Sequence, residues 1–115
     1  MPKPSVLNSQ KTVCQTMKAE FVPPIPKSRI GFARQTIGKR PINGLRHPGQ
    51  GDMNGWYVWF GDYSDDPNFF GSLHVEHLDE VCPEIVPFLA LPPGYRFLID
   101  GEYRDVWFDS KLLVT

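Results

Sequence analysis

Two histidines in one short segment are the side chains best placed to do chemistry. His74 and His77 stand three residues apart in His-Val-Glu-His-Leu, near the start of an expected helix, and this spacing can bring two imidazole rings to one helix face. Glu76, Glu80 or a loop aspartate could complete a metal site. The segment lacks the H-E-x-x-H pattern of metalloproteases, in which the histidines are four residues apart. It therefore indicates either a metal site or rings that pack with a hydrogen bond.

Acidic residues are a second source of chemistry. Asp62, Asp65 and Asp66 resemble the start of a calcium-binding loop, but no glutamate stands at the twelfth position from Asp62, where an EF-hand needs its bidentate ligand. The region from Asp100 to Asp109 holds three aspartates that could serve a paired-carboxylate hydrolase. Acidic residues that flank a turn are usually solvated, and we expect turn-forming aspartates rather than a cation site.

Patterns for covalent or nucleotide chemistry are missing. Cys14 and Cys82 lie far apart, and neither belongs to a C-x-x-C pair. No serine stands in a G-x-S-x-G motif, and the glycines around Gly49 and Gly51 fit turns rather than a phosphate-binding loop. We therefore expect no activated nucleophile and no bound cofactor.

The segment from Gly55 to Gly71 concentrates aromatic side chains beside negative charges. It holds seven of the fifteen aromatic residues of the chain, and its second half is an acidic, turn-rich loop. Stiff aromatic side chains next to charges are typical of recognition surfaces, and aromatic residues are equally typical of a sheet core. Both interpretations stay open. The residues that we expect at a partner-binding surface are Asp62, Tyr63, Asp65, Asp66 and Phe69.

The same segment restricts how its aromatic residues can be used. Side chains alternate between the two faces of a strand. Trp56 and Phe60 should therefore share one face, and Tyr57 and Trp59 should not both lie on that face with them. At least one of these residues should then belong to the core. A third interpretation is a small-ligand pocket with walls formed by Trp56, Trp59 and Trp107.

The elements that must position these residues are short. Twelve prolines and ten glycines among 115 residues favour ordered turns over long helices. We predict one α+β domain over residues 1–115, with a tail at 1–4, a mostly antiparallel sheet of about five short strands and two helical regions. The expected helical regions run from Ser5 to Glu20 and, interrupted by Pro83 and Pro87, from Ser72 to about Leu89. The expected strands are Arg29–Arg34, Ile42–Leu45, Trp56–Phe60, Tyr95–Ile99 and Tyr103–Phe108, the last two joined by a turn at Asp100-Gly101.

Composition restricts the class of protein. Hydrophobic residues at 41% and charged residues at 22% are ordinary for a globular domain. No apolar run approaches the ~18 residues of a membrane span, and the N-terminus lacks the apolar segment of a signal peptide. With two cysteines far apart, we expect a cytoplasmic protein with reduced thiols.

The net charge of −1 hides a division between the two halves of the chain. Residues 1–50 contain nine Lys and Arg and only one acidic residue, whereas residues 51–115 contain three Lys and Arg and twelve Asp and Glu. Such a division can indicate a nucleic-acid or acidic partner. It can also arise where basic and acidic strands lie side by side. We favour the second interpretation, because nucleic-acid binding usually accompanies a basic overall balance.

Six segments follow one another in a recognisable order: Pro41–Pro48, Gly55–Trp59, Ser64–Pro67, Leu73–Leu78, Leu91–Leu98 and Asp105–Asp109. Together they resemble the immunity protein 33 domain family of bacteria, and the likeness runs from about Phe21 to Leu113. Members of that family are inferred to be antidotes that bind a cognate secreted toxin. The resemblance implies that role and a toxin partner, and it implies no catalytic residues.

We therefore predict a non-enzymatic binding protein, an immunity protein that neutralises a bacterial toxin by direct binding. The alternatives are a small metal-dependent hydrolase that uses His74 and His77, and a small-ligand-binding module. We expect no membrane or nucleic-acid partner, and the sequence leaves the oligomeric state open.

Overall fold

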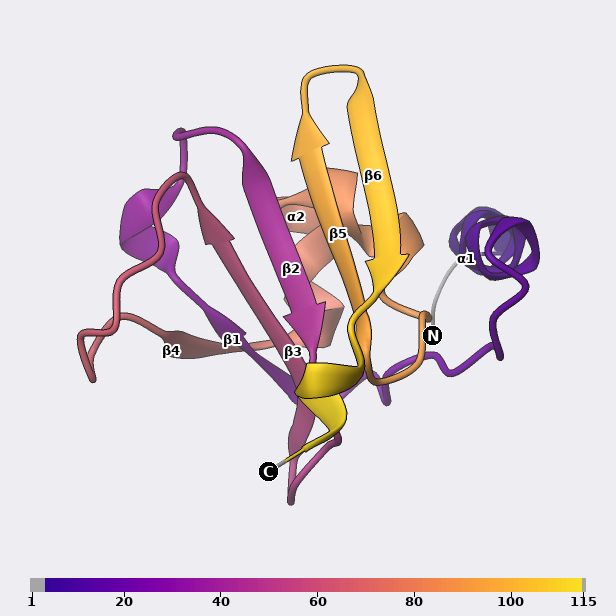
Figure 1. The fold of residues 1–115 in the computed structure, drawn as a ribbon, viewed down its shortest axis with the longest axis horizontal. Helices are drawn as coiled ribbons and strands as arrows, with labels where there is room; N and C mark the ends of the chain where they lie inside the picture. Colours follow the sequence, from indigo (N-terminus) through magenta and orange to yellow (C-terminus); the bar gives the residue numbers. More distant parts are fainter. Residues whose placement is uncertain (1–3, 115) are drawn as a thin grey trace.

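A six-stranded mixed sheet forms the centre of the fold (Figure 1). The computed structural model describes residues 4–114. The strand order is β4-β1-β3-β2-β5-β6, with β1 and β3 parallel and the other neighbours antiparallel. The predicted α+β class is confirmed, with six strands rather than five. The strands are β1 (Arg29–Phe32), β2 (Ile42–Arg46), β3 (Met53–Phe60), β4 (Gly71–His74), β5 (Tyr95–Asp100) and β6 (Tyr103–Phe108).

Strand β4 is the element that the sequence pattern missed. Ser72 was expected to cap a helix, but it lies within β4 and pairs with Gly31 of β1. Four residues are too few to show an alternating pattern, and the pairing with β1 supplies the hydrogen bonds that define the strand. The helical region begins only at Val75.

The interruption of this helical region by proline is confirmed. The region is divided into η2 (Val75–His77), α2 (Leu78–Val81) and η3 (Pro83–Phe88). It is divided because proline lacks the N–H group that would continue a helix. The predicted apolar stripe packs on the sheet, and its most buried members are Leu78, Cys82, Ile85 and Leu89.

Helix α1 (Pro4–Thr16) is shorter than predicted. It begins at Pro4 instead of being capped by Ser5, and only residues 1–3 of the expected tail lie outside the described residues. The helix ends because Lys18 adopts a positive φ of 54°. The N–H of Ala19 then donates to the carbonyl of Cys14 at 2.8 Å, which is the hydrogen bond of a Schellman end.

The two faces of the sheet differ, as the alternation of β3 predicted. Trp56, Val58 and Phe60 belong to the main core on the face that the helices cover. Trp59 belongs to a smaller cluster on the opposite face, which we call the open face. The aromatic residues of β3 therefore do not form one patch.

The remaining differences from the sequence-based expectations are small. The strand expected to reach Arg34 ends at Phe32, and η1 (Arg34–Thr36) follows it. The β5–β6 loop consists of Gly101 and Glu102, one residue later than expected, because Asp100 pairs with Tyr103. No helix among residues 4–114 has the length and apolar character that a membrane crossing requires.

Arg46 is a buried cation that no sequence pattern identified. Its side chain donates to the carbonyl oxygens of Val22, Asn54, Leu89 and Leu91 at 2.7–3.4 Å, and it is 5% exposed. Burial lowers the pKa of Arg46 to about 10, so the guanidinium stays charged at neutral pH. Arg46, which belongs to β2, thereby links this strand to β3, to the segment at Val22 and to the segment from Leu89 to Leu91.

Few of the opposite charges in the two halves of the chain form ion pairs with each other. In the described part of the chain, Arg29 pairs with Asp52 at 3.2 Å and Arg40 with Glu84 at 3.5 Å. Neither contact joins residues that face each other on neighbouring strands. The predicted neutralisation through cross-strand pairs is therefore wrong in its geometry.

Candidate functional site

The loop from β3 to β4, residues 61–70, presents one aromatic side chain to solvent. Tyr63 is 61% exposed, yet its ring lies 5.4 Å from the ring of Trp59, 5.8 Å from that of Phe69 and 6.4 Å from that of Phe70, measured between centroids. Aromatic pairs at these separations attract one another. Tyr63 is thus an exposed side chain that its neighbours hold in place.

Phe69 and Phe70 support Tyr63 from below. Phe69 is only 7% exposed and lies 4.9 Å from Phe70. Phe70 in turn lies 5.2 Å from Tyr57 of β3, which packs over Gly31 of β1. Of the two aromatic residues expected at a partner-binding surface, Tyr63 is therefore accessible, while Phe69 supports it.

Polar side chains hold the backbone of the same loop. The N–H of Asn68 donates to Oδ1 of Asp66 at 2.8 Å, a local turn that aspartate commonly forms. Gln35 donates through Nε2 to the carbonyl of Phe69 at 2.8 Å, and Asn43 donates through Nδ2 to that of Gly61 at 3.2 Å. Both ends of the loop are therefore tied to other elements.

The carboxylates of this loop face solvent. Asp62, Asp65 and Asp66 are exposed, and none of them forms an ion pair with another residue between 4 and 114. Three negative charges consequently stand beside Tyr63 without an ion pair to a cation of residues 4–114, although the side chain of Lys39 lies against Gly61. Residues 61–70 form what we call the aromatic–acidic loop.

On the open face of the sheet, next to this loop, a row of neighbouring side chains runs across four strands. Tyr57 pairs with Leu45, Leu45 with Arg96, and Arg96 with Trp107. The guanidinium of Arg96 lies 5.5 Å from the ring centroid of Trp107, a cation–π distance. This row places half-buried side chains from four strands on one surface.

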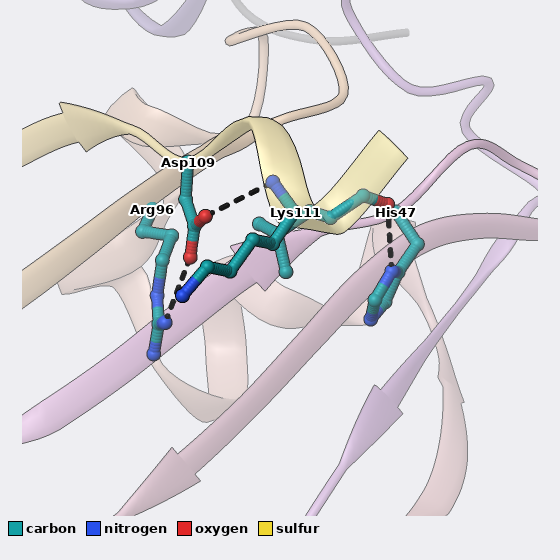
Figure 2. Close-up of polar contacts among 5 residues, drawn as sticks. His47, Arg96, Asp109 and Lys111 are labelled. Carbon is teal, nitrogen blue, oxygen red and sulfur yellow. Dashed lines mark hydrogen bonds and ion pairs between the residues drawn. The ribbon is translucent and has the colours of Figure 1, made fainter. Parts of the chain in front are cut away.

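The C-terminal segment η4 (Ser110–Leu113) borders this row. Figure 2 shows Asp109 between Arg96, whose guanidinium donates to Oδ2 at 3.3 Å, and the backbone N–H of Lys111, which donates to Oδ1 at 3.1 Å. Nδ1 of His47 lies 3.0 Å from the carbonyl oxygen of Leu112 and donates to it, since a carbonyl only accepts. The hydrogen bonds of His47 and Asp109 thus hold η4 against the sheet.

The histidine pair has no third metal ligand beside it among the described residues. The rings of His74, at the end of β4, and His77, in η2, lie 6.1 Å apart between centroids. Within residues 4–114 no group of three or more His, Cys, Asp or Glu side chains is close enough to hold a metal ion. The metal-dependent hydrolase has no assembled centre in this part of the chain.

The three tryptophans do not converge on a pocket. Trp56 is fully buried on the helix-covered face, where its Nε1 donates to the carbonyl of Leu89 at 2.9 Å. Trp59 and Trp107 lie on the open face, on strands that β2 and β5 separate. The proposed tryptophan-walled pocket is therefore wrong, because alternation along β3 points Trp56 and Trp59 in opposite directions.

Both cysteines are free and buried. Burial raises the pKa of Cys14 and of Cys82, and the nearby Arg46 opposes this effect at Cys14. A thiol with a raised pKa is a poor nucleophile at neutral pH. These residues fill the core and offer no covalent chemistry.

Comparison with known proteins identifies a family and no individual relative. A family model described as the Imm33-like domain matches residues 9–109, a range that contains most of α1 and all six strands. No curated protein and no solved structure matches the chain.

Proposed function

The chain belongs to the Imm33-like domain family, and on that basis we propose that it is an immunity protein that neutralises a cognate bacterial toxin by direct, non-enzymatic binding. The observation that carries the proposal is Tyr63, an exposed aromatic side chain held by three neighbouring rings beside carboxylates that form no ion pair with residues 4–114. A protein that protects its own cell in this way would act in the cytoplasm.

The aromatic–acidic loop suits tight binding because little of it has to be ordered when a partner arrives. Immobilising a flexible side chain at an interface costs about 0.5–1.5 kcal/mol. Tyr63 is already held by Trp59, Phe69 and Phe70, and the loop backbone is tied by Gln35 and Asn43. More of the contact energy then contributes to affinity.

The charge of the loop favours a partner with a basic surface. Asp62, Asp65 and Asp66 carry the same sign and lie within one short loop. Opposite charges on two binding surfaces accelerate association and reject partners of the wrong sign. A basic toxin, such as a nuclease, fits this description, and we expect neither a membrane nor a nucleic-acid partner.

A rescue experiment tests the function directly. The protein that co-purifies with this chain from its native host is expressed as the candidate toxin in a bacterial host, with and without the chain. We expect growth to stop without the chain and to resume with it, while the purified pair elutes as one complex. A chain that neither restores growth nor binds the candidate toxin would contradict the proposal.

Charge reversal tests the aromatic–acidic loop as the binding surface. Asp65→Lys with Asp66→Lys should slow association with the toxin at least ~10-fold at low salt, because steering accelerates binding by ~10–10³. The matched control is Asp79→Lys with Glu80→Lys, the same charge change at exposed residues of α2. Equal association rates for the two variants would exclude the loop and leave the function itself to the rescue experiment.

A further inference from the structure

A cleft of about 420 Å³ lies on the helix side of the molecule, away from the aromatic–acidic loop. It runs between α1, the proline-rich segment 23–26 and the η2–α2 region. Its apolar lining comes from Val6, Val75, Val86 and Leu89. A volume of this order is usual for clefts that bind small molecules.

The polar lining of the cleft is mainly acidic. Glu76, Asp79 and Glu80 line it and are exposed, His77 lines it as well, and no lysine or arginine of the described chain does. These carboxylates form no ion pair with residues 4–114. A cationic group placed among them would find a favourable field and no competing lysine or arginine.

Gln10 adds an acceptor inside the cleft. It is 5% exposed and lines the cleft from α1, and its Nε2 donates to the carbonyl of Val86 at 3.0 Å. Among residues 4–114 the side chain forms this one hydrogen bond, so its Oε1 can accept a hydrogen bond from a ligand in the cleft.

We propose that this cleft binds a small amphipathic amine, with the ammonium group between Gln10 and the carboxylates of Glu76 and Glu80 and with the apolar body against Val75 and Leu89. An ammonium group has three N–H donors and no acceptor, which matches a lining that offers an amide oxygen and three carboxylates. The site lies apart from the proposed toxin surface, so the two proposals stand independently.

An extended peptide fits the cleft less well. Peptides that bind in extended form are recognised mainly through hydrogen bonds to their main chain. One wall of the cleft consists of Pro23, Pro24 and Pro26, which have no backbone N–H to donate. The cleft therefore offers a rigid apolar wall and a cationic subsite rather than a ladder of main-chain partners.

Titration of the isotope-labelled full chain with hexylammonium chloride, followed by amide chemical shifts, tests the proposal. We expect saturable shifts at Val6, Gln10 and residues 76–80, with a dissociation constant on the order of millimolar for so small a ligand. Hexanoate has the same apolar chain and the opposite charge, and it should produce no saturable shifts there. Hexan-1-ol, which lacks the charge, should bind more weakly than hexylammonium.

Substitutions connect the binding to the named residues. Glu76→Gln with Glu80→Gln should weaken hexylammonium binding at least ~5-fold, as expected when charged partners are removed. Glu102→Gln, at an exposed glutamate in the β5–β6 loop, should leave it unchanged. Gln10→Met should also weaken it, and its thermal unfolding is measured to exclude a loss of folded protein.

Three results would overturn the proposal. The first is the absence of saturable shifts with hexylammonium at any concentration that leaves the chain folded. The second is equal binding of hexylammonium and hexanoate, which would indicate a purely apolar site. The third is tighter binding of N-acetyl-lysine amide than of hexylammonium, which would indicate a lysine of a partner polypeptide as the occupant.

Discussion

Replacing Arg46 by methionine should destabilise the fold more than replacing any exposed arginine. The guanidinium is the donor for four carbonyl oxygens and also lies 5.7 Å from the ring centroid of Trp56. Methionine fills a similar volume but donates nothing. The oxygen of Leu89 keeps Nε1 of Trp56 as a donor, whereas those of Val22, Asn54 and Leu91 lose their side-chain donor.

The size of the effect follows from these three oxygens. Leaving a buried acceptor unpaired costs about 1–3 kcal/mol, and partial relaxation keeps the total below a simple sum. We therefore expect Arg46→Met to lower the free energy of unfolding by ~3–5 kcal/mol, the lower part of the roughly 3–9 kcal/mol that three such acceptors would cost without relaxation. That is a large share of the roughly 5–15 kcal/mol that stabilises a domain.

Urea unfolding followed by tryptophan fluorescence measures the change. With a slope of ~1–3 kcal/mol per molar urea, the midpoint should fall by about 2 M. Arg46→Lys keeps the charge but cannot reach all four oxygens. Its urea midpoint should therefore lie between that of Arg46→Met and that of the native chain. Arg104→Met is the control, because Arg104 is exposed and its side chain donates only to Gly101. A midpoint for Arg46→Met within ~0.5 M of the native chain would refute the reasoning, since surface substitutions change stability by so little.

Two further predictions concern the core. Gly44→Ala would place a Cβ atom against the ring of Phe97 and should cost about 1–3 kcal/mol by overpacking. Thermal unfolding checks this against Gly71→Ala, whose Cβ would meet only the carbonyl oxygen of Phe32 at 3.7 Å. Burial raises the pKa of both cysteines, so their contribution to stability is present below the unfolded thiol pKa of ~8.5 and is lost as the pH rises above it. The urea midpoint should therefore fall between pH 7 and pH 9.5, and fall less in a Cys14→Ala, Cys82→Ala variant.

The elements that local patterns predicted are those whose signal lies within a few neighbouring residues. Alternation predicted that the aromatic residues of β3 do not all share one face, and the prolines at 83 and 87 predicted the interruption of the second helical region. Helix α1 ends before the predicted Glu20, because Lys18 adopts the left-handed conformation that glycine usually supplies at that position. A local pattern does not predict the end of a helix when a residue other than glycine adopts the positive φ that ends it.

The sequence indicated the residues of the aromatic–acidic loop but not how they are arranged. The sequence indicated Tyr63 and Phe69 as equal members of a surface, whereas burial makes Phe69 a support for Tyr63. The cleft lined by Gln10 was not predicted at all, because it joins α1 to residues more than sixty positions away. Only long-range packing brings such groups together.

Residue order alone determined the alternation, the helix interruptions, the acidic character of the loop and the family of this chain, because each of these is a property of neighbouring residues or of their succession. Tertiary structure alone decided that β4 pairs with β1, that Arg46 is buried among carbonyl oxygens and that Tyr63 stands exposed over Phe69. Each of these outcomes depends on contacts between distant segments, and the stabilisation that such contacts provide exists only once the sheet has formed.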